Sequence, residues 1–259
     1  MIGSSRQKYC QRATPWLALV VLVLLWQLAS SLIANSALIL PSPASVLQSF
    51  VAHGGAIATN AWQTLVTSLL GFAAAIVIGV VVGLAIGVSA SLYKGVYPML
   101  VAFNAVPKVA LMPLLVLWFG IGSVPATILA FSLAVFPIIV NVATGLASID
   151  YEMEDVMRSL GASRMQIVWK IGIPNMTPFL FASFKIAITL AFVGSVLSET
   201  VAANSGIGFL MQEASSRFDV RLVFAGLIAT ALMAVIAYAI CVVIEKRLTR
   251  WTLHTARRH

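Results

Sequence analysis

Charged residues are scarce in this chain. Only 9% of its 259 residues are charged and 61% are hydrophobic, whereas a soluble domain has about 25% charged residues. No Asp, Glu, Lys or Arg occurs in residues 13–93, 109–149 or 222–244. Each of these runs is longer than the roughly 20 apolar residues that span a bilayer. A soluble domain of this size could not bury so many apolar helices, so the sequence predicts an all-α, polytopic membrane protein.

Motifs for disulfide formation, metal binding and ATP binding are also missing. The two cysteines, Cys10 and Cys241, lie at opposite ends of the chain near its expected cytoplasmic side, which argues against a disulfide. His53, His254 and His259 have no companion ligand at metal-binding spacing. No G-x-x-x-x-G-K-[ST] phosphate loop occurs, so the chain is not expected to hydrolyse ATP alone. The sequence therefore predicts neither an enzyme nor a bound cofactor.

The hydrophobic runs predict about six transmembrane helices. They are expected at 15–34, 62–90, 96–120, 124–147, 177–199 and 222–245. The first run is longer than the 7–15 residues or so of a signal-peptide core, so it is predicted to be a retained span. The remaining segments are an N-terminal tail, an extracytoplasmic segment, a cytoplasmic loop inside the core domain of 62–245, and a C-terminal tail. Their expected ranges are 1–14, 35–61, 150–174 and 246–259.

Basic residues are distributed unevenly between the two sides of the predicted membrane protein. One side has only Arg217 and Arg221. The other side has Arg6, Lys8, Arg12, Lys94, Arg158, Arg164, Lys170, Lys246, Arg247, Arg250, Arg257 and Arg258. The positive-inside rule places the richer side, and with it both termini, in the cytoplasm. Topology thus explains the net charge of +8, and no nucleic-acid partner is expected.

Small residues recur at every fourth position of the second predicted span. They are Gly71, Ala75, Gly79, Gly83 and Gly87. Small residues at this spacing leave a groove that a neighbouring helix can enter. Packing within the chain is favoured over a dimer seam.

Charges gather in the segment "MEDVMRSLGASRMQIVWKIGIP" (153–174). Its first apolar residues follow a helical period: Met153, Val156, Met157 and Leu160. Gly161 is expected to end that helix, Ser163 to cap a second short helix at 163–170, and Pro174 to force a turn into the fifth span. So long an ordered loop is seldom a mere connection. Two explanations remain: a helix resting on lipid headgroups, or a docking element for a cytoplasmic partner.

The same segment resembles the EAA loop of ABC importer permeases. That loop reads Glu-Ala-Ala, three residues, Gly, nine residues, then Ile-x-Leu-Pro. Here residues 155–157 read Asp-Val-Met and depart from Glu-Ala-Ala, whereas Gly161 and the Ile-Gly-Ile-Pro of 171–174 match. The stretches "PLLVLWFGIG" (113–122) and "SGIGFLMQEA" (205–214) are similar to the branch that imports nitrate, sulfonates, taurine, bicarbonate and small heterocycles.

The resemblance implies a type I importer permease in the inner membrane. Such a permease pairs with a second copy, with two cytoplasmic ATPase subunits that hydrolyse ATP, and with an extracytoplasmic substrate-binding protein. The loop would then dock on the ATPase. The residues implied in docking are Glu154, Asp155, Met157, Arg158, Leu160, Gly161, Ala162, Ser163, Arg164, Ile171 and Pro174.

Lys108 lies near the middle of the third predicted span, directly after Pro107 and one turn after Asn104. A lysine at that depth costs at least about 2.5–3.5 kcal/mol on insertion scales. It therefore either faces the translocation pathway, with Asn104 beside it, and attracts an anionic substrate, or uses the kink at Pro107 to reach backbone carbonyls or the cytoplasmic surface. Both explanations remain open.

The remaining charges in the spans lie near span ends. Glu199 is the third candidate for the pathway, and an ion pair with Arg217 or Arg221 is expected for it. Lys185 is expected to extend to the cytoplasmic interface. The alternative function is an ion-coupled secondary transporter that needs no ATPase. Such a protein would show inverted repeats and intramembrane carboxylates, and neither is evident here.

Overall fold

The chain folds into helices throughout the part that the structure describes. This computed structural model describes residues 3–33, 36–149 and 151–248. The elements are α1 (Gly3–Leu32), α2 (Ser36–Ile39), α3 (Pro43–Ala52), α4 (Gly54–Gly87), α5 (Ala90–Ala105), the 3₁₀-helix η1 (Lys108–Leu111), α6 (Met112–Phe119), α7 (Ser123–Ala147), α8 (Tyr151–Ser159), α9 (Arg164–Ile167), the π-helix η2 (Val168–Gly172), α10 (Ile173–Ala202), α11 (Ile207–Ser216) and α12 (Val220–Leu248). The all-α prediction is confirmed.

Four unbroken helices among the described residues are long and apolar enough to cross a membrane. They are α4, α7, α12 and a continuous 39-residue helix, Arg164–Ala202, which comprises α9, η2 and α10. The side chains of α1 are described from Leu17 on, and Leu17–Leu32 is an apolar helix as well. The third predicted span, 96–120, is wrong as a single helix, because α5 and the η1–α6 segment meet at a bend of 69°. Pro107 lacks an N–H and disfavours a helical conformation at Val106, which is extended.

Several helix boundaries also differ from the predicted ones. α4 begins at Gly54 and not at 62, and it therefore takes up part of the predicted segment 35–61. The fifth helix starts well before 177, because α9, η2 and α10 are continuous. Outside the described positions lie Asp150, Arg250, His254, Arg257, Arg258 and His259, as do the side chains of Arg6, Lys8, Cys10 and Arg12.

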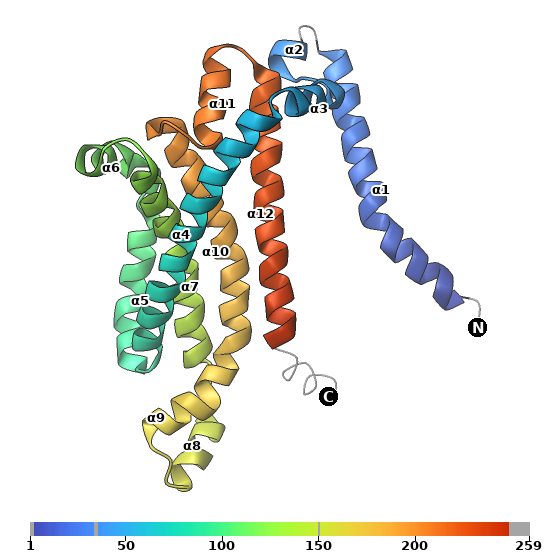
Figure 1. The fold of residues 1–259 in the computed structure, drawn as a ribbon. Helices are drawn as coiled ribbons and strands as arrows, with labels where there is room; N and C mark the ends of the chain where they lie inside the picture. Colours follow the sequence, from blue (N-terminus) through green and yellow to red (C-terminus); the bar gives the residue numbers. More distant parts are fainter. Residues whose placement is uncertain (1–2, 34–35, 150, 249–259) are drawn as a thin grey trace.

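The long helices α4, α5, α7, α10 and α12 lie side by side (Figure 1). α8 and α9 lie at one end of this bundle, hereafter the α8 end. α2, α3, α6 and α11 lie at the other, the α11 end. α1 stands apart from the bundle and meets it only at the α11 end, and its first turns and the last turn of α12 point toward the α8 end.

The stripe of small residues on α4 packs against α7. A Cβ added to Gly71 would lie 2.6 Å from the Cβ of Ala130, and one added to Gly83 would lie 2.7 Å from the Cβ of Val142. Ala75 is fully buried in the same interface. The expectation of packing within the chain is therefore confirmed, because no larger side chain fits between these two helices.

Candidate functional site

The loop between α7 and α10 is a helical hairpin whose first arm is α8. That helix ends as the sequence predicts, because Gly161 has a φ of +78°, a conformation that favours glycine. The N–H of Gly161 donates to the carbonyl of Arg158 (2.9 Å), and the N–H of Ala162 donates to that of Met157 (3.0 Å). These two bonds form a Schellman motif, which satisfies the last carbonyls of α8.

The second arm, α9, begins with the predicted cap at Ser163. Its Oγ accepts from the N–H of Gln166 (3.4 Å), and the Gln166 side chain accepts from the N–H of Ser163 (2.8 Å), which completes a capping box. The predicted turn at Pro174 is wrong. α9 passes through the wider helix η2 into α10, and Pro174 lies directly after this π-helical turn. A proline inside a helix removes one backbone hydrogen bond, and a local change to π-helix is one way in which a helix accommodates it.

The hairpin exposes a row of large apolar side chains. Leu160 is 77% exposed, Val156 60% and Met153 51%, all from the same side of the first arm. Met165 in α9 and Trp169 in the adjoining η2 are 65% exposed each. Glu154 and Arg158 form an ion pair one helical turn apart. Apolar side chains gathered in this way mark a contact with another protein or with a membrane.

The hairpin is attached to the bundle through the end of α4. Arg164 Nη2 donates to the carbonyl of Val88 (2.8 Å), and Ile167 is 3% exposed, whereas its neighbours in α9 are exposed. A cavity of about 230 Å³ separates the hairpin from the ends of α4 and α7. Its lining comprises Gly87, Val88, Leu146, Ala147, Ile149, Glu154, Arg158, Arg164, Ile167 and Val168. Few contacts therefore hold the hairpin in place.

The residues implied in docking fall into two groups. Nine of them lie together in the hairpin: Glu154, Asp155, Met157, Arg158, Leu160, Gly161, Ala162, Ser163 and Arg164. Ile171, in η2, and Pro174, in α10, are half-buried instead. They belong to the helix that leads away from the hairpin.

Lys108 finds its partners within its own chain. Its Nζ donates to the backbone carbonyl of Asn104 (3.0 Å) and to the Asn104 side-chain oxygen (2.9 Å), and Lys108 is 8% exposed. The helix break at Pro107 leaves the Asn104 carbonyl available. Of the two explanations, these contacts support the one in which the lysine reaches a backbone carbonyl. Lys108 belongs to η1, which leads into α6 at the α11 end.

Glu199 is enclosed between α4, α10 and α11. One carboxylate oxygen accepts from the hydroxyl of Thr64 (2.7 Å) and the N–H of Gly208 (3.1 Å), and the other lies 3.3 Å from the hydroxyl of Thr67. The predicted ion pair is wrong, because Arg217 pairs with Glu213, and no basic side chain in the described part of the chain forms a salt bridge with Glu199. At 2% exposed, Glu199 offers no free oxygen to a solute in this conformation.

Two features were not predicted from the sequence. Thr64 and Thr67 are hydroxyl residues nearly one turn apart on an apolar helix, a spacing that could have indicated α4 as the partner of a buried carboxylate. Lys185 was expected only to extend to the interface, but it donates to Glu245 on α12 at 2.8 Å. This ion pair joins α10 to α12.

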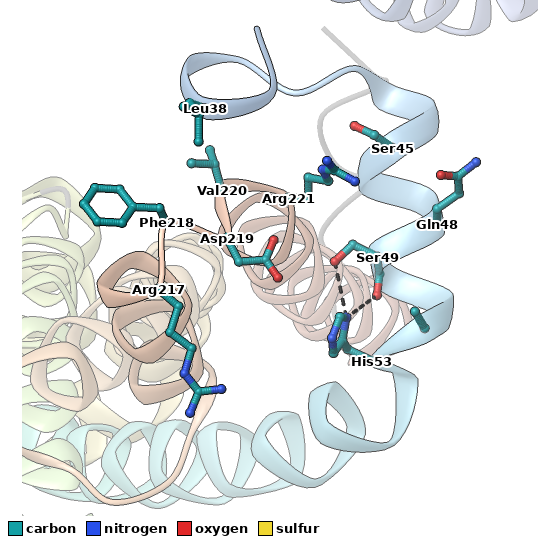
Figure 2. Close-up of a pocket in the computed structure, with 11 residues that line it drawn as sticks. Leu38, Ser45, Gln48, Ser49, His53, Arg217, Phe218, Asp219, Val220 and Arg221 are labelled. Carbon is teal, nitrogen blue, oxygen red and sulfur yellow. Dashed lines mark hydrogen bonds between the residues drawn. The ribbon is translucent and has the colours of Figure 1, made fainter. Parts of the chain in front are cut away.

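The α11 end has a polar cavity of about 490 Å³ between α3 and the turn from α11 to α12. Figure 2 shows that Arg221 points toward α3, whereas Arg217 and Phe218 point away from it. His53, which follows the last residue of α3, has its Nδ1 3.1 Å from the carbonyl of Ser49. The two arginines are the only basic residues that the sequence assigns to the extracytoplasmic side.

Residues 75–250 match the model of one protein family, described as the binding-protein-dependent transport system inner membrane component. The chain belongs to this family. The match runs from the middle of α4 to the end of α12 and includes the hairpin. The protein is thus a multi-pass permease subunit of an ABC importer and not an enzyme. The family works with ATPase and substrate-binding components.

Curated relatives are similar over nearly the whole chain. The riboflavin transport system permease protein RibX of Chloroflexus aurantiacus is 34% identical over 235 residues, which are 90% of this chain and 88% of the relative. The putative aliphatic sulfonates transport permease protein SsuC of Escherichia coli is 32% identical over 251 residues, 95% and 94%. The formylaminopyrimidine transport permease protein ThiX of Halalkalibacterium halodurans is 29% identical over 242 residues, 93% and 96%.

A solved structure confirms the fold. A chain of the inward-facing MetNI methionine ABC transporter superposes with a TM-score of 0.57 at 21% identity, over 71% of this chain and 94% of that chain. The type I importer permease fold that the resemblance implied is therefore present.

Proposed function

We propose that this permease lines the translocation pathway together with a second copy, and that its hairpin docks on a cytoplasmic ATPase subunit. The observation that carries the proposal is the exposed apolar row on the hairpin, in a chain whose family works with ATPases. One chain offers one such hairpin, so a dimer with twofold symmetry would engage two ATPase subunits. These subunits would hydrolyse the ATP, because the chain has no phosphate loop.

The proposed orientation places the α8 end in the cytoplasm and both termini on the same side. The excess of Lys and Arg in the predicted cytoplasmic loops and tails supports it. The first turns of α1 and the last turn of α12 also point toward the α8 end. The α11 end would then face the substrate-binding protein, and the polar cavity of Figure 2 would lie on that face.

The proposed substrate is a small anion, such as a sulfonate, taurine, nitrate or bicarbonate, or a small heterocycle. Relatives named for riboflavin, aliphatic sulfonates and formylaminopyrimidine are 34%, 32% and 29% identical to this chain, so similarity alone does not separate the two classes. Specificity would lie mainly in the binding protein. Mass spectrometry of the ligand that stays bound to that protein through native purification would identify the class, and an inorganic cation as ligand would contradict both.

The docking proposal is tested by a change to the most exposed residue of the hairpin. Leu160→Asp places a charge on the apolar row and is expected to abolish association with the ATPase, because a contact core excludes unpaired charge. Phe218→Asp is the matched control. Phe218 is also 77% exposed but lies at the α11 end, and its φ of +58° suits Asp.

Association is measured by co-purification in detergent and by the mass of the complex. The expected result is two permease and two ATPase chains for the wild type and for Phe218→Asp, and a permease free of ATPase for Leu160→Asp. An undiminished complex with Leu160→Asp, or uptake by the permease without any ATPase, would overturn the proposal.

A further inference from the structure

Helix α11 begins without a capping side chain of its own. Its N-cap residue is Gly206, although the first N–H groups of any helix need acceptors. The N–H of Gly206 donates to the side-chain oxygen of Asn60 (2.8 Å), and the N–H of Ile207 donates to the hydroxyl of Thr64 (2.8 Å). The N–H of Gly208 donates to Glu199 (3.1 Å). The start of α11 is therefore capped by two residues of α4 and one of α10.

Thr64 is the centre of this arrangement, which we call the Glu199 network (Asn60, Thr64, Thr67, Glu199 and the N–H groups of residues 206–208). Its hydroxyl accepts from Ile207 and donates to the Glu199 carboxylate at 2.7 Å. Thr64 is 0% exposed and Glu199 2%. A buried carboxylate is stable only when donors surround it, and the start of a helix favours a negative charge. The network thus provides acceptors for the first N–H groups of α11 and donors for the carboxylate of Glu199.

The network leaves no room for a larger residue. Gly206 has a φ of +108°, and a Cβ there would overlap the Glu199 carboxyl group. A Cβ on Gly208 would overlap the carbonyl of Val196. α11 therefore cannot shift relative to the end of α10 without breaking these hydrogen bonds.

Glu199 lies near the end of the same continuous helix that carries the second arm of the hairpin at its start. That helix, Arg164–Ala202, has 39 residues, which is about 60 Å at 1.5 Å per residue. The helix thus forms a continuous connection between the hairpin and Glu199. Any movement of this end of α10 would act first on the residues that are hydrogen-bonded to Glu199, which belong to α4 and α11.

We propose that Glu199 and Thr64 are positioning residues that make α11 and the neighbouring end of α4 follow α10, so that the α11 end responds when an ATPase moves the hairpin. This inference rests on the proposed docking of the hairpin. Among the described residues, the side-chain hydrogen bonds that join α4 to the start of α11 belong to the Glu199 network, beside an apolar cluster that includes Ile57 of α4 and Ile207 of α11. Without the network, no side-chain hydrogen bond would join α4 or α10 to the start of α11 in the described part of the chain.

Thr64→Val tests the inference, because Val has nearly the shape of Thr but no hydroxyl. Thr64→Ser keeps the hydroxyl and serves as the conservative variant. Thr200→Val is the matched control, since the Thr200 hydroxyl donates only to Leu197 in its own helix (2.8 Å). Glu199→Gln provides a second, independent change to the network.

The importer is reconstituted with its ATPase and binding protein, and three quantities are measured: basal ATP hydrolysis, its stimulation by the loaded binding protein, and amide hydrogen exchange of residues 206–208. Thr64→Val and Glu199→Gln are expected to speed this exchange and to reduce stimulated hydrolysis about tenfold, the factor that corresponds to a lost buried hydrogen bond. Basal hydrolysis, association with the ATPase, Thr64→Ser and Thr200→Val are expected to stay at wild-type values.

Faster exchange with full stimulation would overturn the inference, because the network would then serve only the structure of α11. Loss of ATPase association in Thr64→Val would also overturn it, because the defect would then be general misfolding. A wild-type permease that never binds the ATPase would instead defeat the proposed function, so the two failures are distinguishable.

Discussion

The two ends of the helix Arg164–Ala202 differ in what surrounds their polar groups. At the α8 end the hairpin exposes apolar side chains and is joined to α4 by one hydrogen bond, from Arg164 to Val88. At the α11 end the Glu199 carboxylate is 2% exposed and bonded to two other helices. One end is built for contact with another molecule, and the other for contact within the chain.

A glycine with positive φ lies near each end of this helix. The two glycines are needed for different reasons, one for its backbone conformation alone and the other also for lack of space. At Gly161 (φ +78°) nothing lies within 4 Å of an added Cβ. At Gly206 (φ +108°) the added Cβ meets the Glu199 carboxyl group. Both positions strain other residues, but only the second also excludes them by volume.

The largest effect is expected from Gly206→Ala. The added Cβ combines backbone strain of about 1–3 kcal/mol with an overlap that must displace Glu199 from its donors. We expect little monodisperse protein in detergent, measured by size-exclusion chromatography. Gly161→Ala carries the strain without the overlap and should give nearly the wild-type amount. Equal yields of the two variants would remove the distinction between the glycines.

Gly161→Val is expected to act on coupling and not on folding. A β-branched residue at positive φ is strained, and it would change the angle between the two arms of the hairpin while meeting no neighbour. The variant should insert and purify normally but lose transport and association with the ATPase. Transport at the wild-type rate would show that the hairpin does not depend on this turn.

A smaller effect is expected at the bend between α5 and η1. Lys108→Met removes the cation that donates twice to Asn104, and hydrogen bonds to charged groups contribute about 1.5–3 kcal/mol. The melting temperature should fall by several degrees, and less for Lys108→Arg, which keeps the charge in another geometry. Uptake of an anionic substrate should remain. Reduced uptake at unchanged melting temperature would instead return Lys108 to the translocation pathway.

Sequence predicted the hairpin better than the Glu199 network, and the reason is the distance along the chain between interacting residues. Gly161 and Ser163 form their bonds within four residues of themselves, so local patterns identify them. Thr64 and Glu199 are 135 positions apart, and only the packing of α4 against α10 brings them together. Its negative charge alone suggested an arginine as the partner of Glu199, although hydroxyl and backbone N–H groups donate to its carboxylate instead.

Hydropathy also fails to predict helix breaks, because these depend on the backbone and not on how apolar the side chains are. The run 96–120 is apolar throughout except for Asn104 and Lys108, yet Pro107 breaks the helix inside it. Pro174 has the opposite outcome, because the helix widens to the π-helical turn η2 at 168–172 just before it and then continues as α10. Whether a proline breaks a helix or is accommodated in it depends on the backbone around it, which the sequence does not reveal.

The smallest effect is expected from Ser195→Ala, and its sign is opposite to that of Thr64→Val. Both hydroxyls are fully buried, but Thr64 has three partners in the Glu199 network or its own helix, whereas no partner of the Ser195 hydroxyl occurs among the described residues. An unpaired buried hydroxyl costs about 1–3 kcal/mol, so its removal should raise the melting temperature slightly. Thr64→Val should lower it. A lower melting temperature of the assembled importer with Ser195→Ala would mean that this hydroxyl gains a partner on assembly. The surroundings of Ser195 on α10 would then change on assembly, whereas the Glu199 network is already complete in the single chain.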